Sequence, residues 1–422
     1  MNAKKPNGVI YFIVYIIFYP LLKALFRLKV RREGPLPDKP FLVLSNHSSF
    51  MDFLLVMLAF YPLRLNAVAA RKFFLYRPLD KLLPFMGCIP KNLFDPDARS
   101  IISIRNSLKR GGSVLLFPEG RCSTDGEYAG IHASTGKLIK SLGVPVVGCR
   151  IEGSYLCMPF WRKGIRRGRV VVSISGLFTA EEAGTASVDE INAAIDERLS
   201  GADAKPYGKT FRTSRARRLA EGLEQIIYLC PQCKSEFRLS TKGNEVRCYA
   251  CGMRAVMGRD GTMAAAGGGR LGAGMTVPAW YKEQIRHEMS GLREDMRPII
   301  LRVAVKSPAK EAGGGMRASG RGILRLSPKG WEYRGELDGR IEELLFPIDT
   351  VPALPFDPND DFQIYSGGSF YMFTPQDPLW CAKYSVVGEC AYHRFASRVM
   401  MTVKLRHEEG GPVGAAPTKP PV

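Results

Sequence analysis

Apolar residues dominate the start of the chain, where the segment from Val9 to Phe26 contains one charged side chain, Lys23. As a helix, these residues would rise about 27 Å, slightly less than the ~30 Å hydrocarbon core of a bilayer. Pro20 would bend such a helix. The pattern predicts a hydrophobic membrane anchor at residues 1–30, either spanning or half-inserted, and a buried core helix is the alternative.

Short apolar runs and amphipathic stretches then alternate as far as Arg218. Strands are predicted at 40–47, 65–70, 113–120, 144–151 and 168–175, and helices at 50–60, 98–112 and 133–143. Strands that alternate with helices are typical of an α/β domain. We therefore expect residues 31–222 to form a mixed, mostly parallel sheet flanked by helices.

The second half of the chain has a different pattern. Residues 223–262 contain paired cysteines and predict a zinc ribbon, and the glycine-rich residues 263–279 predict a flexible linker. A helix and several β-like runs follow within residues 280–407; the runs include 321–335, 361–374 and 379–387. They predict a small β-rich domain, a barrel or a sandwich, and their number suggests a pleckstrin-homology-like barrel. Residues 408–422 are disordered by composition.

The charge and the cysteines narrow the possible partners. The formal net charge is +20, so the surface should attract anions such as nucleic acid, phospholipid head groups or phosphorylated substrates. Basic residues flank the predicted anchor: Lys4, Lys5, Lys29, Arg31 and Arg32. They would face an anionic phospholipid membrane. Four of the ten cysteines form two C-x-x-C pairs and six are scattered, a pattern that favours a reducing compartment. We expect a membrane-associated protein whose catalytic domain lies on the cytoplasmic side.

The stretch LSNHSSFMDFLL, residues 44–55, places His47 and Asp52 in otherwise apolar sequence. A buried histidine beside a helix-capping acid is the simplest explanation of an isolated pair. On one ideal helix the two side chains would point ~140° apart, so they meet only if His47 precedes the helix and Asp52 lies in its first turn. In that geometry Asp52 would fix the imidazole tautomer and leave the other nitrogen free as a base.

Three further motifs follow in order: MGCIPKN at 86–92, FPEGRCS at 117–123 and VPVVGCRI at 144–151. Together with NHSSFMD at 46–52, they resemble the four sequence blocks of the glycerolipid acyltransferase family. The best-known members of that family are 1-acyl-glycerol-3-phosphate acyltransferases. The resemblance covers about residues 10–210, and its first and third blocks are the more specific ones.

The resemblance implies an acyltransferase that moves a fatty acyl group to the free hydroxyl of 1-acyl-glycerol-3-phosphate, forming phosphatidic acid. Acyl-CoA or acyl-carrier protein would be the acyl donor, and no redox cofactor is expected. His47 would be the general base and Asp52 its orienting acid. A lysophospholipid acceptor would bind at the FPEG loop, where Glu119 orients the loop or a hydroxyl, Gly120 permits close backbone approach and Arg121 holds the phosphate.

The chain departs from the family pattern in two places. The third block usually has threonine and then arginine after the glycine, whereas this chain has Arg121 and then Cys122. The second block usually ends in arginine, whereas this chain has Leu93. Lys91 could supply the missing cation as a point charge, and a solvated loop lysine is the alternative. Asn46, next to His47, is the remaining candidate for substrate binding.

No G-x-S-x-G motif is present, which disfavours a serine-nucleophile mechanism. Ser48, Ser49 and Cys122 remain alternatives as nucleophiles. The atypical cations leave open another lysophospholipid as the acceptor.

The paired cysteines Cys230, Cys233, Cys248 and Cys251 have the spacing C-x2-C-x14-C-x2-C. Four thiolates from two such pairs suit a closed, structural Zn²⁺ site, although a rubredoxin-like iron site uses similar ligands. Many zinc ribbons bind nucleic acid or protein, but this one lacks an evident aromatic stacking platform. We interpret the ribbon and the C-terminal domain as structural or protein-binding modules. A zinc-ribbon nucleic-acid-binding protein is the alternative, and the hydrophobic N-terminus argues against it.

Overall fold

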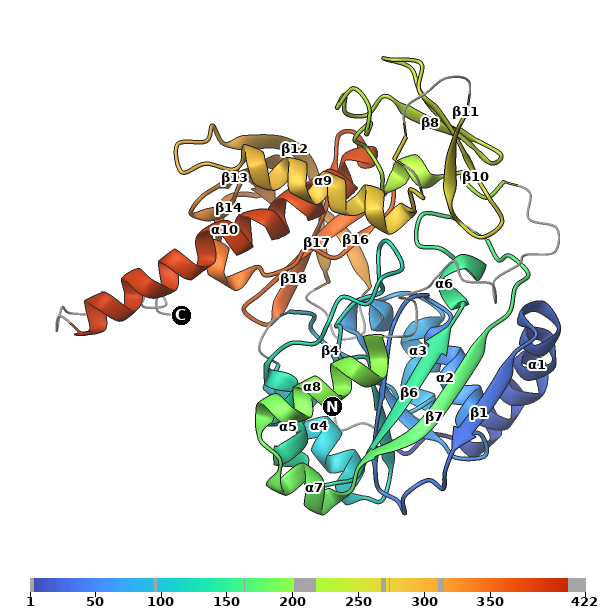
Figure 1. The fold of residues 1–422 in the computed structure, drawn as a ribbon. Coiled ribbons are helices and arrows are strands. Elements are labelled where there is room, and N and C mark those ends of the chain that lie inside the picture. The colour runs from blue at the N-terminus through green and yellow to red at the C-terminus, as the bar shows by residue number, and fades with distance from the viewer. Residues whose placement is uncertain are drawn as a thin grey trace.

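The computed structural model describes residues 4–94, 97–162, 164–200, 218–266, 271–272, 274–309 and 315–408 (Figure 1). A seven-stranded sheet in the order β1-β7-β6-β2-β5-β3-β4 organises the first half of the chain. Its strands are β1 (Lys29–Glu33), β2 (Leu42–Ser45), β3 (Leu65–Ala70), β4 (Ile89–Lys91), β5 (Ser113–Leu116), β6 (Val146–Glu152) and β7 (Val171–Phe178). Every neighbouring pair is parallel except β6 with β7, which confirms the predicted mixed, mostly parallel sheet.

Helices cover both faces of this sheet (Figure 1). They are α2 (Asp52–Phe60), α3 (Leu79–Phe85), α4 (Ala98–Lys109), α5 (Ser134–Leu142), α7 (Ala180–Thr185) and α8 (Val188–Ser200), with the short η1 (Arg71–Leu75) and α6 (Ser154–Cys157). The consecutive residues Leu42, Val43 and Leu44 belong alternately to two separate cores. This alternation is the period of a strand with both faces buried, which explains why β2 appears in the sequence as a continuous apolar run.

Helix α1 (Gly8–Phe26) lies against this domain with one face only. Its buried residues are Tyr11, Leu22 and Phe26, and the Tyr11 hydroxyl donates a 2.6 Å hydrogen bond to the carbonyl of Leu65. Its opposite face exposes large apolar side chains: Val9, Phe12, Ile13, Ile16, Ile17, Phe18 and Leu21. Within the described residues, α1 is the one helix whose length and composition would allow it to cross a membrane.

The ribbon consists of η2 (Leu223–Gln225) and a four-stranded antiparallel sheet. The strands are β8 (Leu239–Lys242), β9 (Glu245–Cys248), β10 (Arg254–Met257) and β11 (Met263–Ala266). The strand β11 corrects part of the predicted linker at 263–279, because its backbone pairs with β10 and Met263 is buried. The end of that segment also differs, since α9 (Val277–Gly291) begins there; residues 267–270 and 273 lie outside the described part.

The C-terminal unit contains an antiparallel sheet in the order β15-β14-β13-β12-β18-β17-β16. Its strands are β12 (Ile299–Pro308), β13 (Met316–Ser327), β14 (Gly330–Leu337), β15 (Arg340–Pro347), β16 (Phe356–Asp357), β17 (Asp361–Ser366) and β18 (Ser369–Pro375), with η3 (Ile348–Thr350) between β15 and β16. The strand predicted at 379–387 is wrong: η4 (Pro378–Trp380) and the first turns of α10 (Cys381–Glu408) occupy these residues. Cys381, Tyr384, Val387 and Ala391 are all buried, and their spacing matches one face of a helix. The predicted tail lies outside the described residues except for Glu408, which ends α10.

The C-terminal unit packs against the first domain. Lys72 forms a 2.8 Å ion pair with Asp357, and the rings of Phe160 and Phe356 meet edge to face with centroids 5.2 Å apart. In Figure 1, α9 and α10 lie above the end of the first domain from which the loop after β5 emerges. That loop carries the third sequence block, so the contacts between the two units bear directly on the candidate site.

Candidate active site and metal centre

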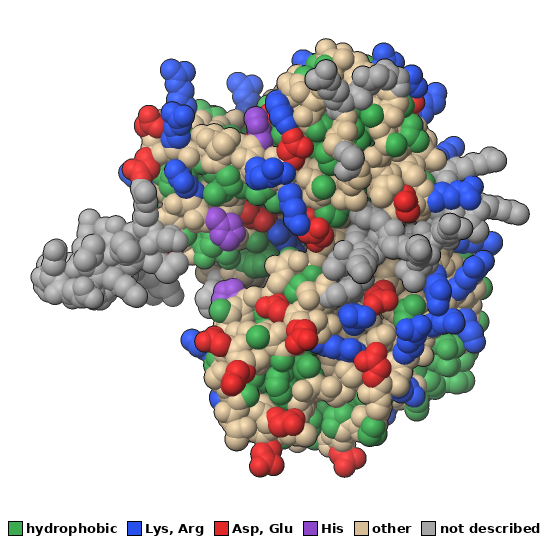
Figure 2. Space-filling view, viewed as in Figure 1, with side chains coloured by type: hydrophobic (Ala, Val, Ile, Leu, Met, Phe, Trp, Pro, Cys, Tyr) green, Lys and Arg blue, Asp and Glu red, His purple; other side chains and the backbone are tan. Residues whose placement is uncertain are grey.

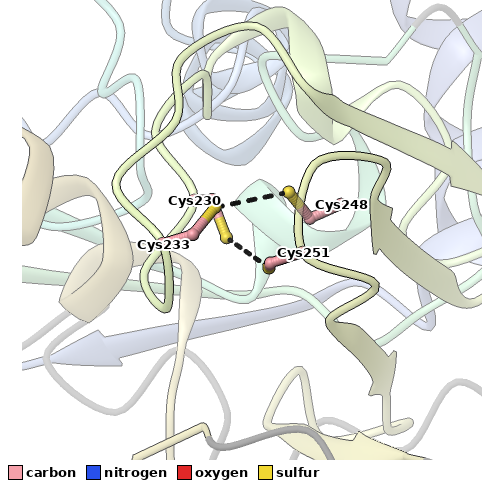
Figure 3. A group of neighbouring side chains, drawn as sticks. All are labelled: Cys230, Cys233, Cys248 and Cys251. Atoms are coloured by element: carbon pink, nitrogen blue, oxygen red, sulfur yellow. Dashed lines mark hydrogen bonds between the residues drawn. The ribbon is translucent and has the colours of Figure 1, made fainter.

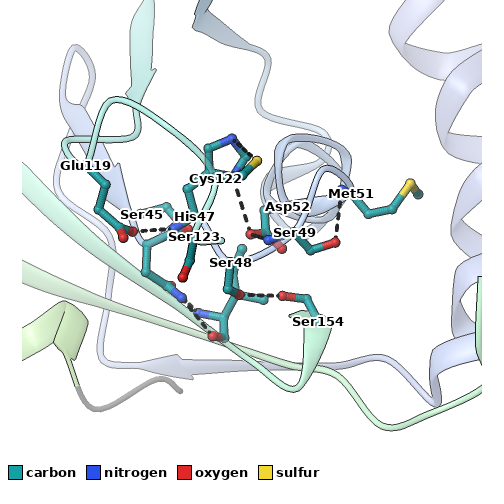
Figure 4. Close-up of polar contacts among 12 residues, drawn as sticks. Ser45, His47, Ser48, Ser49, Met51, Asp52, Glu119, Cys122, Ser123 and Ser154 are labelled. Carbon is teal, nitrogen blue, oxygen red and sulfur yellow. Dashed lines mark hydrogen bonds and ion pairs between the residues drawn. The ribbon is translucent and has the colours of Figure 1, made fainter. Parts of the chain in front are cut away.

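His47 and Asp52 meet at the junction between β2 and α2 (Figure 4). His47 lies in the turn after β2, and Asp52 is the first residue of α2, which is the arrangement required for their side chains to approach. The His47 Nδ1 lies 3.4 Å from Asp52 Oδ2, and the same oxygen accepts a 2.7 Å hydrogen bond from the backbone N–H of Ser49. Asp52 is fully buried, whereas 18% of the His47 side chain is exposed. A buried carboxylate therefore holds one ring nitrogen of a partly accessible histidine.

Glu119 connects the third sequence block to the first. Its Oε1 accepts a 2.6 Å hydrogen bond from the backbone N–H of His47, and its Oε2 accepts a 3.0 Å bond from the N–H of Ala129. The backbone N–H of Ser123 donates a 2.8 Å bond to the carbonyl of His47. Burial raises the pKa of Glu119 to about 7, against the lowering effect of the two backbone hydrogen bonds. Both polar groups of the His47 backbone are thus tied to the loop after β5.

Two side chains of that loop contact the imidazole directly. The ring of Phe117 stacks on the ring of His47 with centroids 4.2 Å apart. The Cys122 sulfur lies 3.1 Å from Nε2 and 3.6 Å from Nδ1. Because the two distances are similar, the sulfur does not lie in the direction of the lone pair of either nitrogen.

Several charges act on the pKa of His47. Burial lowers it, but the neighbouring Cys122 and Asp52 raise it more, so the pKa lies well above the ordinary value of 6.5. A base must be neutral to accept a proton. Deprotonation of His47 is therefore a step that the surrounding charges oppose near neutral pH.

Arg121 lies in the same loop but is engaged by the C-terminal unit. Its guanidinium forms a bidentate ion pair with Glu389 of α10, with 2.9 Å between Nη2 and Oε2 and a second contact between Nη1 and Oε1. The adjacent Gly120 has φ +75°, and a Cβ there would lie 3.4 Å from the ring of Phe94. Glycine is the residue that takes this backbone conformation without strain, and it turns the chain between Glu119 and Arg121.

The remaining substrate-binding candidates lie farther from the imidazole. The amide of Asn46 is buried, and both of its polar atoms bond to the backbone of Ile151, at 3.0 and 2.7 Å. This pairing joins the end of β2 to β6, a positioning role that differs from the expected substrate contact. Lys91 ends β4, three strands from β2 in the sheet. With strands ~4.8 Å apart, that separation is roughly 14 Å, so the structure does not bring Lys91 next to His47.

Sequence reasoning missed two residues of this site. Glu389 is 268 positions from Arg121, and no local motif marks it. Tyr281 of α9 lies beside the Arg121–Glu389 pair, and both charges act on the pKa of its hydroxyl. One feature of the sequence pointed to the contact between Cys122 and His47. In the third block, Cys122 stands where the family pattern has arginine, because the arginine is displaced by one position.

The four ribbon cysteines converge from two similar turns (Figure 3). Their sulfur atoms all lie within 4.8 Å of one another, and the pairs Cys230–Cys251 and Cys233–Cys248 are 3.8 Å apart. Four sulfurs at ~2.3 Å from a tetrahedral Zn²⁺ would be ~3.8 Å from each other. The donor set and its dimensions therefore fit structural zinc.

Comparisons with known proteins match the two parts of the chain that contain these residues. Residues 27–152 match a family model described as Acyltransferase, and residues 223–259 match one described as DNA directed RNA polymerase, 7 kDa subunit. The chain is 29% identical over 154 residues to a chloroplastic 1-acyl-sn-glycerol-3-phosphate acyltransferase, LPAT1, of Arabidopsis thaliana, which covers 35% of this chain and 42% of that protein. It is 27% identical over 152 residues to the chloroplastic BAT2 enzyme of the same name from Brassica napus, covering 36% of this chain and 43% of that protein.

Among solved structures, the chain is similar to the 1-acyl-sn-glycerophosphate acyltransferase PlsC of Thermotoga maritima. The sequence identity is 21% and the TM-score is 0.39, over 45% of this chain and 77% of that chain. The matched region spans less than half of each of the two plant proteins.

Proposed function

We propose that the protein transfers a fatty acyl group to the free hydroxyl of a lysophospholipid, with 1-acyl-glycerol-3-phosphate as the first candidate acceptor, because residues 27–152 match the acyltransferase family model. The observation that carries the proposal is a partly exposed His47 whose Nδ1 faces the buried carboxylate of Asp52. Acyl-CoA or acyl-carrier protein would supply the acyl group, and phosphatidic acid would be the product.

In this mechanism His47 carries its proton on Nδ1, facing Asp52, and its Nε2 is the base. Nε2 takes the proton of the acceptor hydroxyl while the hydroxyl oxygen attacks the thioester carbonyl. The C–S bond then breaks, the thiolate of the donor leaves, and the proton held by His47 neutralises it. Asp52 stabilises the imidazolium formed in between. No covalent acyl-enzyme is required, because both substrates bind together.

The other residues of the site would position these groups. Glu119 holds the backbone N–H of His47, and Asn46 ties the residue before His47 to β6, through the bonds described above. Gly120 lets the loop turn, and Arg121 lies in the same loop as the residues that contact His47, where its guanidinium is suited to an acceptor phosphate.

We further propose that α1 is half-inserted in an anionic membrane surface. One face of α1 packs on the domain, whereas the other is apolar and exposed, which suits a helix lying at an interface. Exposed basic residues surround it: Lys23, Arg27, Lys29, Arg31 and Arg32. Figure 2 shows basic side chains gathered on this side of the molecule, next to an apolar patch. The cysteines outside the four-cysteine cluster form no disulfide in the described part of the chain, which fits a domain on the cytoplasmic side.

The test is an acyl-transfer assay on membranes or vesicles that compares wild type with His47→Ala. If the base contributes ~10²–10⁴-fold, the variant should lose at least that factor in kcat. His132→Ala is the matched control, because His132 lies in the same domain and its Nδ1 is hydrogen bonded to the nearby Ser134. An active His47→Ala enzyme would contradict the assignment of the base.

A panel of acceptors separates the two candidate substrates. Faster transfer to 1-acyl-glycerol-3-phosphate than to lysophosphatidylcholine, lysophosphatidylethanolamine or monoacylglycerol supports phosphatidate synthesis. The pairing of Arg121 with Glu389 favours the alternative, an acceptor without a phosphomonoester, and preference for such an acceptor would displace the first candidate.

A further inference from the structure

The ion pair between Arg121 and Glu389 joins the loop of the third sequence block to the C-terminal helix α10. Both side chains are largely buried, with 26% of Arg121 and 22% of Glu389 exposed. Burial lowers the pKa of Arg121, but the Glu389 carboxylate raises it more, so the guanidinium stays charged. The contact is bidentate, and both ends of the guanidinium fork point at the carboxylate.

A carboxylate and a phosphate present similar pairs of oxygens to such a fork. The donors that would hold an acceptor phosphate are therefore the donors that already hold Glu389. In the part of the chain that the structure describes, Glu389 has no ion pair other than the one with Arg121, and its other polar contact is a 3.4 Å hydrogen bond from the Ser385 hydroxyl. Asp125 is a further acidic side chain near Arg121, and like Glu389 it favours the charged guanidinium.

We propose that Glu389 is a specificity-determining residue of the acceptor site, an internal anion that the acceptor phosphate must displace from Arg121. This inference rests on the proposed function and names how its acceptor is selected. Acceptors with a phosphomonoester compete with Glu389 for Arg121. Their apparent affinity equals the intrinsic affinity multiplied by the fraction of molecules in which Arg121 is free, and this fraction is small. Acceptors without phosphate leave the pair intact and avoid this reduction.

The contacts around the pair support a displaceable arrangement rather than a fixed core. Lys282 of α9 forms an ion pair with Glu127 of the same loop, and both side chains are well exposed, at 57% and 37%. Helices α9 and α10 therefore contact the loop after β5 through polar side chains. Water and a ligand can replace such contacts at moderate cost in free energy.

The experiment compares wild type with Glu389→Gln, which removes the charge and keeps a similar shape. We expect the KM for 1-acyl-glycerol-3-phosphate to fall about tenfold, which corresponds to about 1.4 kcal/mol, with no change in the KM for monoacylglycerol. Glu389→Asp, which withdraws the carboxylate by one methylene, should give a smaller fall. An unchanged or higher KM for the phosphate acceptor in both variants would overturn the proposal.

Lys282→Gln is the matched control, because it breaks another ion pair between the same loop and the same C-terminal unit without touching Arg121. If Lys282→Gln lowers the KM as much as Glu389→Gln does, loosening of the unit explains the effect and the proposal fails. In an Arg121→Gln background, Glu389→Gln should change the KM no further; an equal fall there would also refute direct competition.

A binding measurement separates this proposal from the proposed function. Calorimetry with glycerol 3-phosphate should show about tenfold tighter binding to Glu389→Gln than to wild type, whether or not acyl transfer occurs. Tighter binding without acyl transfer would support the role of Glu389 and refute the enzyme assignment. Acyl transfer with equal binding to both proteins would refute the role of Glu389 alone.

Discussion

The exposed apolar face of α1 allows a quantitative prediction of membrane binding. Ile13 and Ile17 are one helical turn apart on that face and are 45% and 54% exposed. Complete burial of an isoleucine side chain contributes ~1.5–3 kcal/mol, so the exposed half of each contributes about 1 kcal/mol when it enters lipid. The double variant Ile13→Ser/Ile17→Ser should therefore lose about 2 kcal/mol of membrane binding, which is ~30-fold in the partition coefficient.

The assay is co-sedimentation of the purified protein with vesicles that contain anionic phospholipid. Ile300→Ser/Ile341→Ser is the matched control, because these isoleucines are even more exposed, at 63% and 75%, but lie in β12 and β15. Both variants should unfold at nearly the wild-type temperature, since none of the four side chains is buried. Equal vesicle binding by the α1 variant and wild type, or an equal loss in both double variants, would refute the insertion of this face.

Three further predictions concern the loop and the ribbon. Burial lowers the pKa of His47, but Cys122 and Asp52 raise it more, to a value above 6.5. Because the neutral imidazole is the base, kcat/KM should increase as the pH rises through this pKa. Cys122→Ala should move the increase to lower pH, and an unmoved pH profile would contradict the contact between Cys122 and His47. Gly120→Ala should reduce the free energy of unfolding by about 1–2 kcal/mol in a denaturant titration. Gly111→Ala has nearly the same φ and no neighbour within 4 Å, and a Cβ at Gly120 would lie at ordinary contact distance from Phe94, so both variants should lose a similar amount; no loss at Gly120 would contradict the strain assigned to its φ. Cys251→Ser should reduce bound zinc measured by a colorimetric chelator, whereas Cys122→Ala should retain it; undiminished zinc in Cys251→Ser would refute the four-cysteine site.

The sequence predicted the first domain well because its signals are local. Apolar runs such as 42–45 become strands buried on both faces, and the spacing of His47 and Asp52 permits one arrangement in which they meet. The strand β1 was missed because its residues, KVRRE, carry no apolar pattern, and its pairing with β7 is made through the backbone at the sheet edge. The apolar run 379–387 fits a strand or a helix, and only packing against α9 and the C-terminal sheet decides for α10.

The pair of His47 with Asp52 and the pair of Arg121 with Glu389 differ in the same way, because one is local in sequence and the other is not. The geometry of His47 and Asp52 depends on a turn of a few residues, whereas Arg121 meets a residue from the other end of the chain. Nothing in the FPEGRCS motif indicates that its arginine is neutralised by a carboxylate. Long-range ion pairs of this kind depend on how domains dock, which composition and spacing do not encode.

The contacts of the ribbon with α9 indicate what structural zinc would contribute to this chain. The buried Gln284 of α9 accepts hydrogen bonds from the backbone N–H groups of Tyr228 and Leu229 and donates one to the carbonyl of Ile226, at 2.6, 3.0 and 3.1 Å. The indole of Trp280 donates a 2.8 Å bond to the carbonyl of Leu229, directly before the first zinc ligand, Cys230. The folded ribbon therefore fixes α9, which in turn packs on α10.

Bound zinc would then affect the ion pair between Arg121 and Glu389 from a distance, through α9 and α10. Loss of the metal should unfold the cysteine turns next to residues 226–230 and so release α9. Because α9 packs on α10, its release should loosen α10 and weaken the ion pair between Glu389 and Arg121. Chelation of the wild-type protein should therefore tighten glycerol 3-phosphate binding in the same direction as Glu389→Gln, and should have little effect on the Glu389→Gln variant. If chelation of the wild type weakens the binding of glycerol 3-phosphate, the ribbon supports the acceptor site directly. In that case the ribbon does not act by restraining α10.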